Sequence, residues 1–286
     1  MKDYSLYEKT YLEDKGFPLY VRCFTYADEG PVFYAHWHEQ LEILYFFEGK
    51  GIIELDKKQI EVDSEDIIIV NSNELHSGYC TEKPLKYYYI ALDTSLIRCS
   101  VDGNCEQKYI TPITQNHIMF SNKISGNPTA VECIKNIIAE YEMKEPGFEL
   151  SIKSYVYRLL VFLLRNHMDR VLTQREYKLH IQNLQMLNKV LEFIESSYME
   201  EITIDKITEI ACLSRFHLSR LFKRLTGKSI NDYINSIRID KAEQLIKNTS
   251  LNMTEIAMTT GFNDANYFSR IFKKYKKTAP SEVRRA

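Results

Sequence analysis

One short sequence pattern occurs twice in the last hundred residues, and this duplication restricts the possible folds more than any other feature of the chain. The first copy has three parts, which are Ile207-Thr208, Cys212-Leu213 and the run from Leu218 to Arg224. The second copy has Ile256-Ala257, Gly261-Phe262 and the run from Phe268 to Lys274. The first two parts lie 49 residues apart in the two copies, and the third part lies 50 residues apart. The repeat predicts two similar basic heads for one elongated, negatively charged partner, and DNA is the obvious candidate.

Each copy has the sequence signals of a capped amphipathic helix. Ser214 and Asp264 are good N-cap residues, and Gly227 is placed to end the first helix. Apolar residues follow each cap at the i, i+3, i+4, i+7 spacing of one buried face. They are Leu218, Leu221, Phe222 and Leu225 in the first copy, and Phe268, Ile271, Phe272 and Tyr275 in the second. A short helix and a tight turn precede each one, at 205–212 and 254–260, which is the layout of a helix-turn-helix.

A third helix is expected between the copies, from Ile230 to about Lys247. Eighteen helical residues span about 27 Å, so such a rod can hold two reading helices about one DNA turn, or 34 Å, apart. The spacing permits simultaneous contact with two adjacent major grooves.

Residues 184–286 resemble the AraC-type DNA-binding domain. The matching residues are Leu213-Ser214, 218–223, Thr226-Gly227, Tyr233, Arg238, Ala242, Ile256-Ala257, Gly261-Phe262, Asp264, 267–274, Pro280 and Arg284. The sequence departs from the family pattern at four positions, where it has Thr208, Lys277, Ala279 and Val283. These departures affect the last helix and one packing contact.

The resemblance implies that both basic helices read the major groove. Arginine is the usual bidentate reader of guanine and asparagine of adenine, whereas lysines mostly meet phosphates. By position, the residues expected at base edges are Phe216, Ser219, Arg220, Asn266, Ser269 and Arg270. Those expected at phosphates are Lys223, Lys273 and Lys274.

The first part of the chain, from residue 17 to about 92, is predicted to form short strands of a sandwich or barrel. The strand segments are 41–47, 51–55, 59–62, 67–70 and 86–92, with turns expected at 48–50, 56–58 and 71–73. Two amphipathic helices follow at 130–143 and 150–168, separated by Pro146-Gly147. The polar stretch from Met168 to about Gln182 is the expected linker.

Four side chains in the strand region form a candidate site. If His36, His38 and Glu42 belong to one strand, their even separations place them on one face, and a strand carrying His76 can complete the set. They resemble the cupin motif pair, with the first motif intact and the second degenerate. In metal-dependent cupin enzymes such residues hold a catalytic metal. In AraC-type regulators the cupin-like domain is usually a ligand sensor, where they bind effector or support the pocket. The expected effector site is Tyr34, His36, His38, Glu42, Tyr45 and His76.

Charge and cysteine usage fit this division of the chain. Residues 1–183 contain 20 Lys/Arg and 27 Asp/Glu, which gives a formal charge of −7. Residues 184–286 contain 17 Lys/Arg and 12 Asp/Glu, which gives +5 and a net charge of −2 for the chain. A basic C-terminal part is typical of a nucleic-acid-binding module. The six cysteines have no metal-ligand spacing, which favours reduced thiols in the cytoplasm. Neither a signal peptide nor a membrane span is expected.

The sequence therefore predicts a two-domain α+β protein that is not an enzyme and needs no cofactor. Its expected parts are a cupin-like barrel at 1–125, a helical dimerisation segment and linker at 126–183, and an all-α double helix-turn-helix domain at 184–286. The expected function is a sequence-specific transcriptional regulator, an activator by resemblance, controlled by a sugar-like effector in the barrel. Its expected partners are double-stranded DNA, a second copy of the chain and RNA polymerase. The alternatives are a metal-dependent cupin enzyme with a DNA-binding tail, using His36, His38, Glu42 and His76, and an architectural DNA-binding protein without an effector.

Overall fold

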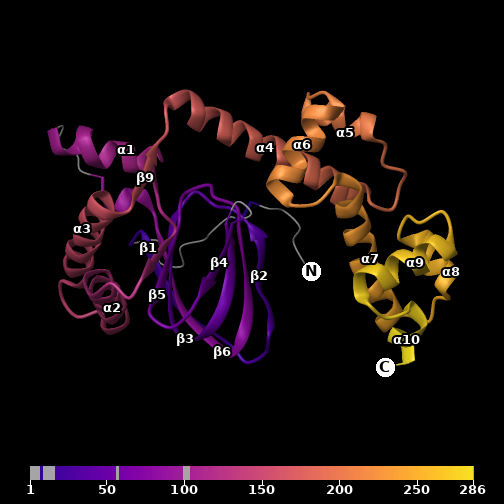
Figure 1. Ribbon diagram of the computed structural model, residues 1–286, viewed down its shortest axis with the longest axis horizontal. Coiled ribbons are helices and arrows are strands. Elements are labelled where there is room, and N and C mark those ends of the chain that lie inside the picture. The colour runs from indigo at the N-terminus through magenta and orange to yellow at the C-terminus, as the bar shows by residue number, and fades with distance from the viewer. Residues whose placement is uncertain (1–6, 9–16, 56–57, 99–103, 286) are drawn as a thin grey trace. The chain divides into compact units, whose positions relative to one another are not determined.

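The computed structural model describes residues 7–8, 17–55, 58–98 and 104–285 (Figure 1). They form two compact units that meet in sequence between Ile181 and Gln182. Within the described ranges, no helix is long and apolar enough to cross a membrane. The turn expected at 56–58 lies mostly outside the described residues, and Lys58 begins a strand.

The N-terminal unit is built on one seven-stranded antiparallel sheet that folds back on itself. Its strands are β1 (Leu19–Tyr26), β2 (Gly30–His36), β3 (Leu41–Leu55), β4 (Lys58–Val62), β5 (Asp66–Val70), β6 (His76–Leu92) and β8 (Lys123–Ser125). The two longest, β3 and β6, pair along most of their length. At one end they are flanked by β5 and β1, and at the other by β4 and β2. The predicted β-rich, cupin-like fold is confirmed.

The turn predicted at residues 48–50 is wrong, because β3 continues through it. The pairing of β3 with β6 shifts register three times between Phe46 and Gly51. Such bulges bend a strand without ending it. Because of the bend, β3 and β6 each contribute residues to both layers of the folded sheet.

The bend also determines which side chains face the interior of the sheet. Leu44 and Phe46 point inward, where they pack with Ile53 and Leu55 from beyond the bulge. Their alternate neighbours Ile43 and Tyr45 point outward, since successive side chains of a strand face opposite sides.

Two helices cover the outward face. They are α2 (Pro128–Met143), capped by the side chain of Asn127, and α3 (Phe148–Asn166). Their buried residues join Ile43, Ile67 and Ile90 of the sheet in one core. The remaining small elements are η1 (Thr94–Leu96), η2 (Glu106–Ile110), α1 (Thr111–Thr114), β7 (Ile118–Phe120) and β9 (Met168–Val171). The expected linker is thus regular structure, with β9 paired to β7 and followed by the helix α4 (Gln174–Ser197).

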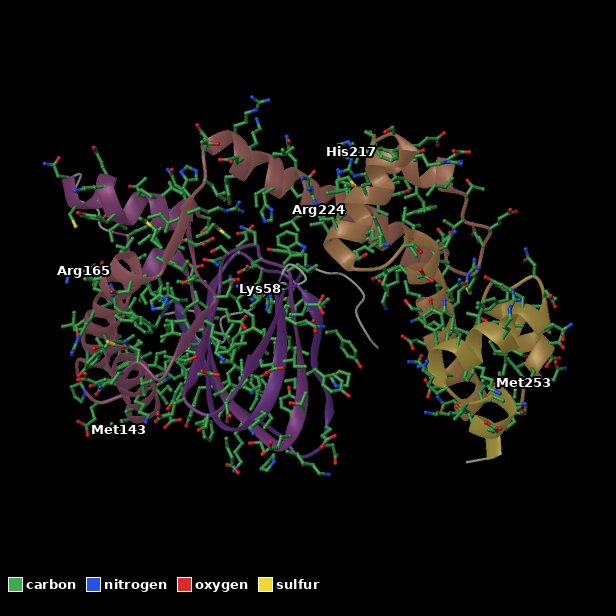
Figure 2. All side chains as sticks on the ribbon, in the orientation of Figure 1. Lys58, Met143, Arg165, His217, Arg224 and Met253 are labelled. Atoms are coloured by element: carbon green, nitrogen blue, oxygen red, sulfur yellow. The ribbon has the colours of Figure 1, made fainter. Side chains whose placement is uncertain are left out.

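The C-terminal unit is helical and confirms the double helix-turn-helix layout. Its helices after α4 are α5 (Ile204–Ala211), α6 (Arg215–Thr226), α7 (Ile230–Asn248), α8 (Met253–Thr259), α9 (Ala265–Lys276) and α10 (Pro280–Arg285). The pairs α5–α6 and α8–α9 are the two copies, and α7 joins them. His217 and Arg224 mark α6 in Figure 2.

Arg238 of α7 connects the end of α4 to the turn of the second copy. Its Nε donates to the carbonyl of Tyr198 at 2.7 Å and its Nη2 to that of Glu200 at 2.8 Å. The guanidinium carbon also lies 5.7 Å from the ring centre of Phe262. Gly261 passes so close to this arrangement that a Cβ there would lie 2.4 Å from the Tyr198 carbonyl oxygen.

Candidate functional site

The two basic helices begin and end in the same way. Ser214 Oγ accepts the backbone N–H of His217 at the start of α6, and Asp264 accepts that of Asn266 at the start of α9. Both predicted caps are confirmed. Each helix ends in a left-handed residue, Gly227 with φ 73° and Lys277 with φ 63°. The two copies thus share their backbone course as well as their sequence pattern.

All nine residues expected at DNA lie on the solvent side of these helices. Phe216, Ser219, Arg220, Lys223, Asn266, Ser269, Arg270, Lys273 and Lys274 are exposed. The apolar stripe beneath them is buried, with Leu218, Phe222, Phe268 and Phe272 fully enclosed. The amphipathic pattern therefore leaves the basic face of each helix free of the unit's own core.

The two copies also place an arginine against an exposed aromatic ring. The Arg220 guanidinium lies 5.4 Å from the ring centre of Phe216, and that of Arg270 lies 5.3 Å from Tyr267. Phe216 is 71% exposed, so most of its ring remains accessible beside Arg220. Tyr267 was not among the predicted contact residues, although its spacing one turn before Arg270 was visible in the sequence.

Lys274 of the second basic face is paired within the unit. Its Nζ lies 3.6 Å from Asp232 of α7, and it also lies over the ring of Tyr275. The Tyr275 hydroxyl donates to the backbone carbonyl of Asp232 at 2.9 Å. This contact ties the end of α9 to the connecting helix, so part of the Lys274 charge is already balanced within the unit.

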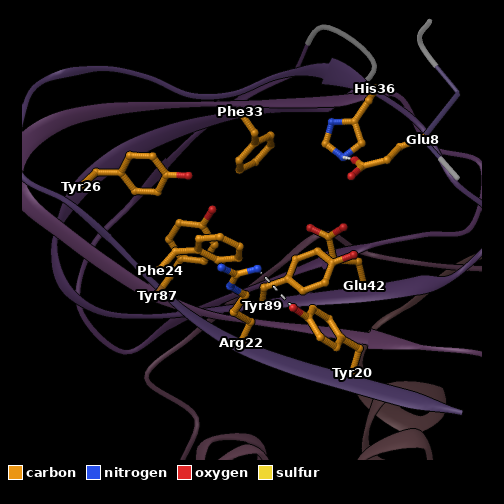
Figure 3. Close-up of a pocket in the computed structure, with 10 residues that line it drawn as sticks. All are labelled: Glu8, Tyr20, Arg22, Phe24, Tyr26, Phe33, His36, Glu42, Tyr87 and Tyr89. Carbon is orange, nitrogen blue, oxygen red and sulfur yellow. Dashed lines mark hydrogen bonds and ion pairs between the residues drawn. The ribbon is translucent and has the colours of Figure 1, made fainter. Parts of the chain in front are cut away.

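The second candidate site is a cavity of about 440 Å³ inside the folded sheet (Figure 3). Strand β1 lines it with four alternate side chains, since strand residues two apart share a face. The lining residues are Glu8, Tyr20, Arg22, Phe24, Tyr26, Phe33, His36, Glu42, Tyr87 and Tyr89. Six aromatic rings and four polar or charged groups therefore meet in one space.

The predicted His/Glu set comes together at one end of this cavity. Ligand atoms of His36, His38, Glu42 and His76 all lie within 4.8 Å of one another. Glu42 Oε2 is 2.6 Å from His38 Nε2 and 3.4 Å from His76 Nε2. The side chains of His38, Glu42 and His76 are each at most 2% exposed. His36 instead pairs with Glu8, at 2.8 Å between Nε2 and Oε2.

The predicted convergence is right, but its structural reason differs from the one expected. Strand β2 ends at His36 and β3 begins at Leu41, so His38 lies in the connection between them. His76 begins β6 and pairs directly with His36. Three backbone segments, rather than one strand face, bring the imidazoles together.

Two predicted effector residues lie away from the cavity. Tyr34 is 61% exposed on β2. Tyr45 is three residues from Glu42, an odd separation in one strand, so it faces α2 and lines a different groove with Lys135 and Glu142. The lining residues missed by sequence reasoning include Glu8, Phe33 and the β1 set. For the β1 set, the alternation of Tyr20, Arg22, Phe24 and Tyr26 was the available signal.

The pKa values in the cluster are shifted by burial and by the neighbouring charges. Burial acts to raise the pKa of Glu42. The charges of His76 and His38 and their hydrogen bonds to Glu42 lower this pKa by a larger amount, so it lies well below its usual range. Burial lowers the pKa of His76. Burial also acts to lower the pKa of His36, yet the hydrogen bond to Glu8 and the nearby Glu42 charge raise it overall.

Comparison with known proteins gives matches to both parts of the chain. A family model for an AraC-like ligand binding domain matches residues 18–160, and one for a helix-turn-helix domain matches residues 207–286. The chain is 25% identical to an uncharacterized HTH-type transcriptional regulator, YdeC, from Bacillus subtilis, over 86% of this chain and 84% of that protein. It is 26% identical to the HTH-type transcriptional activator RhaS of an Enterobacter species, over 88% and 87%.

The solved structures that match part of this chain include the C-terminal domain of the two-component response regulator yesN from Fusobacterium nucleatum, which is 38% identical to this chain. The match covers 33% of this chain and 93% of that one, with a TM-score of 0.32.

Proposed function

Because this chain belongs to the AraC family of transcriptional regulators, we propose that it activates transcription when a small sugar-like effector occupies its N-terminal cavity. The family places it among DNA-binding regulators with a ligand-binding domain, and the reported relatives are regulators rather than enzymes. The proposal assigns effector binding to residues 1–125, dimerisation to 126–183 and DNA reading to 184–286, and it sets the protein in the cytoplasm with its DNA.

The observation that carries DNA reading is the matched pair of exposed helix faces. Each has a side-chain N-cap, an arginine beside an exposed ring, and an apolar stripe buried beneath. Arg220 and Arg270 read guanine, and Asn266 reads adenine. Phe216 contacts a thymine methyl, Ser219 and Ser269 approach neighbouring base edges, and the three lysines meet phosphates.

The chemistry of the cavity supports a polyhydroxylated effector. Its aromatic walls suit the C–H faces of a sugar ring, while Arg22, His36 and Glu42 supply hydrogen-bonding groups. Phe24, Tyr26 and Tyr87 are stacked on one another at 5.6 to 6.4 Å between ring centres, which gives a continuous wall rather than isolated rings.

We also propose that the protein is a homodimer formed through α3, whose outer face carries exposed Leu150, Tyr157 and Val161. A groove beside this face, lined by Tyr109, Leu160 and Leu164 among others, would receive apolar side chains of the partner. Sedimentation velocity of a Val161→Asp variant checks this point, since a charge there should shift the protein to monomer. RNA polymerase would be recruited by the DNA-bound dimer.

Footprinting across the genome, with and without a panel of sugars, tests the whole proposal. We expect footprints with two contact regions about one helical turn apart, which change in position or occupancy with one class of sugar. Binding that ignores sequence, or that no sugar affects while the cavity is intact, would contradict it. The second outcome would favour the architectural alternative.

A further inference from the structure

Each basic helix carries an arginine whose guanidinium lies over an exposed aromatic ring from one turn earlier in the same helix. In α6 the guanidinium carbon of Arg220 lies 5.4 Å from the ring centre of Phe216, and in α9 that of Arg270 lies 5.3 Å from the ring centre of Tyr267. The aromatic residue differs between the copies, and so does its spacing from the arginine, yet residues three or four apart share one helix face. Both helices therefore present the same pair of groups to solvent.

The N–H groups of both arginines are available to a partner. Among the described residues, neither Arg220 nor Arg270 has a hydrogen bond or an ion pair. By contrast, Arg215 of α6 donates to Asp205 at 2.9 Å, and Arg238 of α7 donates to two backbone carbonyls. A ring against the face of a guanidinium orients the side chain without using any of its five donors. Each reading arginine is therefore held ready for a partner with two acceptors side by side, such as the guanine edge.

The ring beside each arginine provides an apolar surface on an otherwise polar helix face. Phe216 is 71% exposed and Tyr267 is 39% exposed. The apolar group that base edges offer in the major groove is the C5-methyl of thymine, and cytosine has only a hydrogen at that position. The ring centre and the guanidinium lie more than 5 Å apart in both copies, whereas successive bases of one strand rise by about 3.4 Å. The two groups are therefore spaced to contact neighbouring bases rather than one base.

Resting on the DNA reading of the proposed function, we propose that each copy recognises a two-base step, a guanine next to a pyrimidine that carries a C5-methyl group. The arginine donates to the O6 and N7 atoms of the guanine, and the ring covers the methyl group. The ring contacts the methyl and no other part of the pyrimidine, so 5-methylcytosine substitutes for thymine. Each half-site of the operator then contains such a step, and methylation of a cytosine beside the guanine raises the affinity of the protein for DNA.

The test compares DNA duplexes that differ by a single methyl group. The full-length protein first selects its preferred sequence from a random duplex library, with and without the panel of sugars. In the selected duplex, each thymine beside a guanine is then replaced by uracil, which pairs with adenine as thymine does. A second pair of duplexes has cytosine or 5-methylcytosine at the same position, and both of these bases pair with guanine. Within each pair the hydrogen-bonding groups stay the same, so a difference in affinity measures the methyl group alone.

We expect the loss of one methyl group from either half-site to weaken binding about 4-fold, which corresponds to about 0.8 kcal/mol for one buried methyl. The duplex with 5-methylcytosine should bind more tightly than its cytosine counterpart by about the same factor. In Phe216→Ala the methyl effect should disappear at one half-site, while the preference for guanine remains. Phe216 is 71% exposed, so this variant keeps the core of its unit. Tyr267→Phe keeps the ring and loses only the hydroxyl, so this matched control should behave as wild type.

Equal affinity for the two members of each duplex pair, with a selected sequence in hand, would overturn this inference and leave the proposed function standing. A methyl effect that persists at both half-sites in Phe216→Ala would also overturn it, because the ring would then not be the cause. Selection that enriches no sequence at all would refute DNA reading itself, and this inference with it. The duplex comparison uses wild-type protein, so it decides the question even if a variant fails to fold.

Discussion

Gly261 and Gly227 offer a matched test of the packing in the DNA-reading unit. Both have positive φ, of 84° and 73°, and both follow a helix of a helix-turn-helix copy. An alanine at either position destabilises the folded state by about 1–2 kcal/mol, because its backbone must adopt the left-handed conformation. This cost is partly offset by about 0.5–1 kcal/mol, because alanine loses less conformational entropy on folding than glycine does. The net conformational cost is about 1 kcal/mol in each case.

The two sites differ in the space available for a Cβ. At Gly227 no atom lies within 4 Å, so Gly227→Ala should cost only that conformational amount. At Gly261 the Cβ would lie 2.4 Å from the Tyr198 carbonyl oxygen and 2.9 Å from Arg238 Nε. Relief of this overlap has to break the hydrogen bond between those two groups, which is charge-assisted and worth about 1.5–3 kcal/mol. Gly261→Ala should therefore destabilise by about 3 kcal/mol.

Urea unfolding of the full-length protein measures the difference. Circular dichroism at 222 nm follows the helices, while fluorescence of Trp37 follows the N-terminal unit alone. With a slope of about 2 kcal/mol per molar urea, we expect midpoint shifts of about 0.5 M for Gly227→Ala and about 1.5 M for Gly261→Ala in the helical transition. The Trp37 transition should stay unchanged in both. Equal shifts for the two variants would refute the close approach of Gly261 to Tyr198 and Arg238.

Three further predictions concern the same unit. Lys277→Gly should stabilise the C-terminal unit by about 0.5–1 kcal/mol, because Lys277 occupies the left-handed position that Gly227 fills in the other copy. Differential scanning calorimetry checks this, and a lower melting temperature of the variant would contradict it. Arg220→Ala should reduce the preference for one base pair by about 1–3 kcal/mol, whereas Lys273→Ala should weaken binding to all sequences and reduce the slope of log affinity against log salt concentration by about 1. Affinities for a set of operator variants distinguish the two effects. Identical affinity profiles for the two variants would exclude base reading by Arg220. The Ser229 hydroxyl donates a hydrogen bond to the Asp232 carboxylate, and this bond together with the Lys274 charge lowers the pKa of Asp232 although burial opposes them. The ionised carboxylate therefore stabilises the fold above about pH 4, and this contribution is lost as the pH falls further. Asp232→Asn should flatten the acid side of a plot of melting temperature against pH, and an unchanged plot would refute the role.

The features predicted correctly from the sequence are those fixed by local chemistry. Ser214 and Asp264 cap their helices because each oxygen reaches N–H groups two or three residues away. The first three residues of each apolar stripe of α6 and α9 are buried because their spacing matches one helical face, whereas Leu225 and Tyr275 at the stripe ends are only partly buried. The helix that joins the two copies was likewise expected from the sequence pattern, from Ile230 to about Lys247, and α7 matches it.

The features predicted wrongly depend on residues far apart in the chain. Glu48-Gly49-Lys50 has the composition of a turn, but its pairing with β6 makes it a bulge in one continuous strand. The stretch from Met168 has the polarity of a linker and leads to the boundary between the two units, but its first residues form β9, whose partner β7 lies about fifty residues earlier. Tyr45 was assigned to the pocket by residue type alone, although its odd separation from Glu42 already placed it on the opposite face.

The course of the two long strands also sets the order in which the two units refold from urea. The N-terminal unit has to join Leu19 and Leu41 to Leu92 before its layers can close, whereas the helices of the C-terminal unit mostly contact their sequence neighbours. Folding slows as contacts become less local, so the helical unit should regain its native structure first after dilution of the denaturant. A refolding chain would then pass through an interval in which both helix-turn-helix copies are formed while the cavity of the N-terminal unit is not.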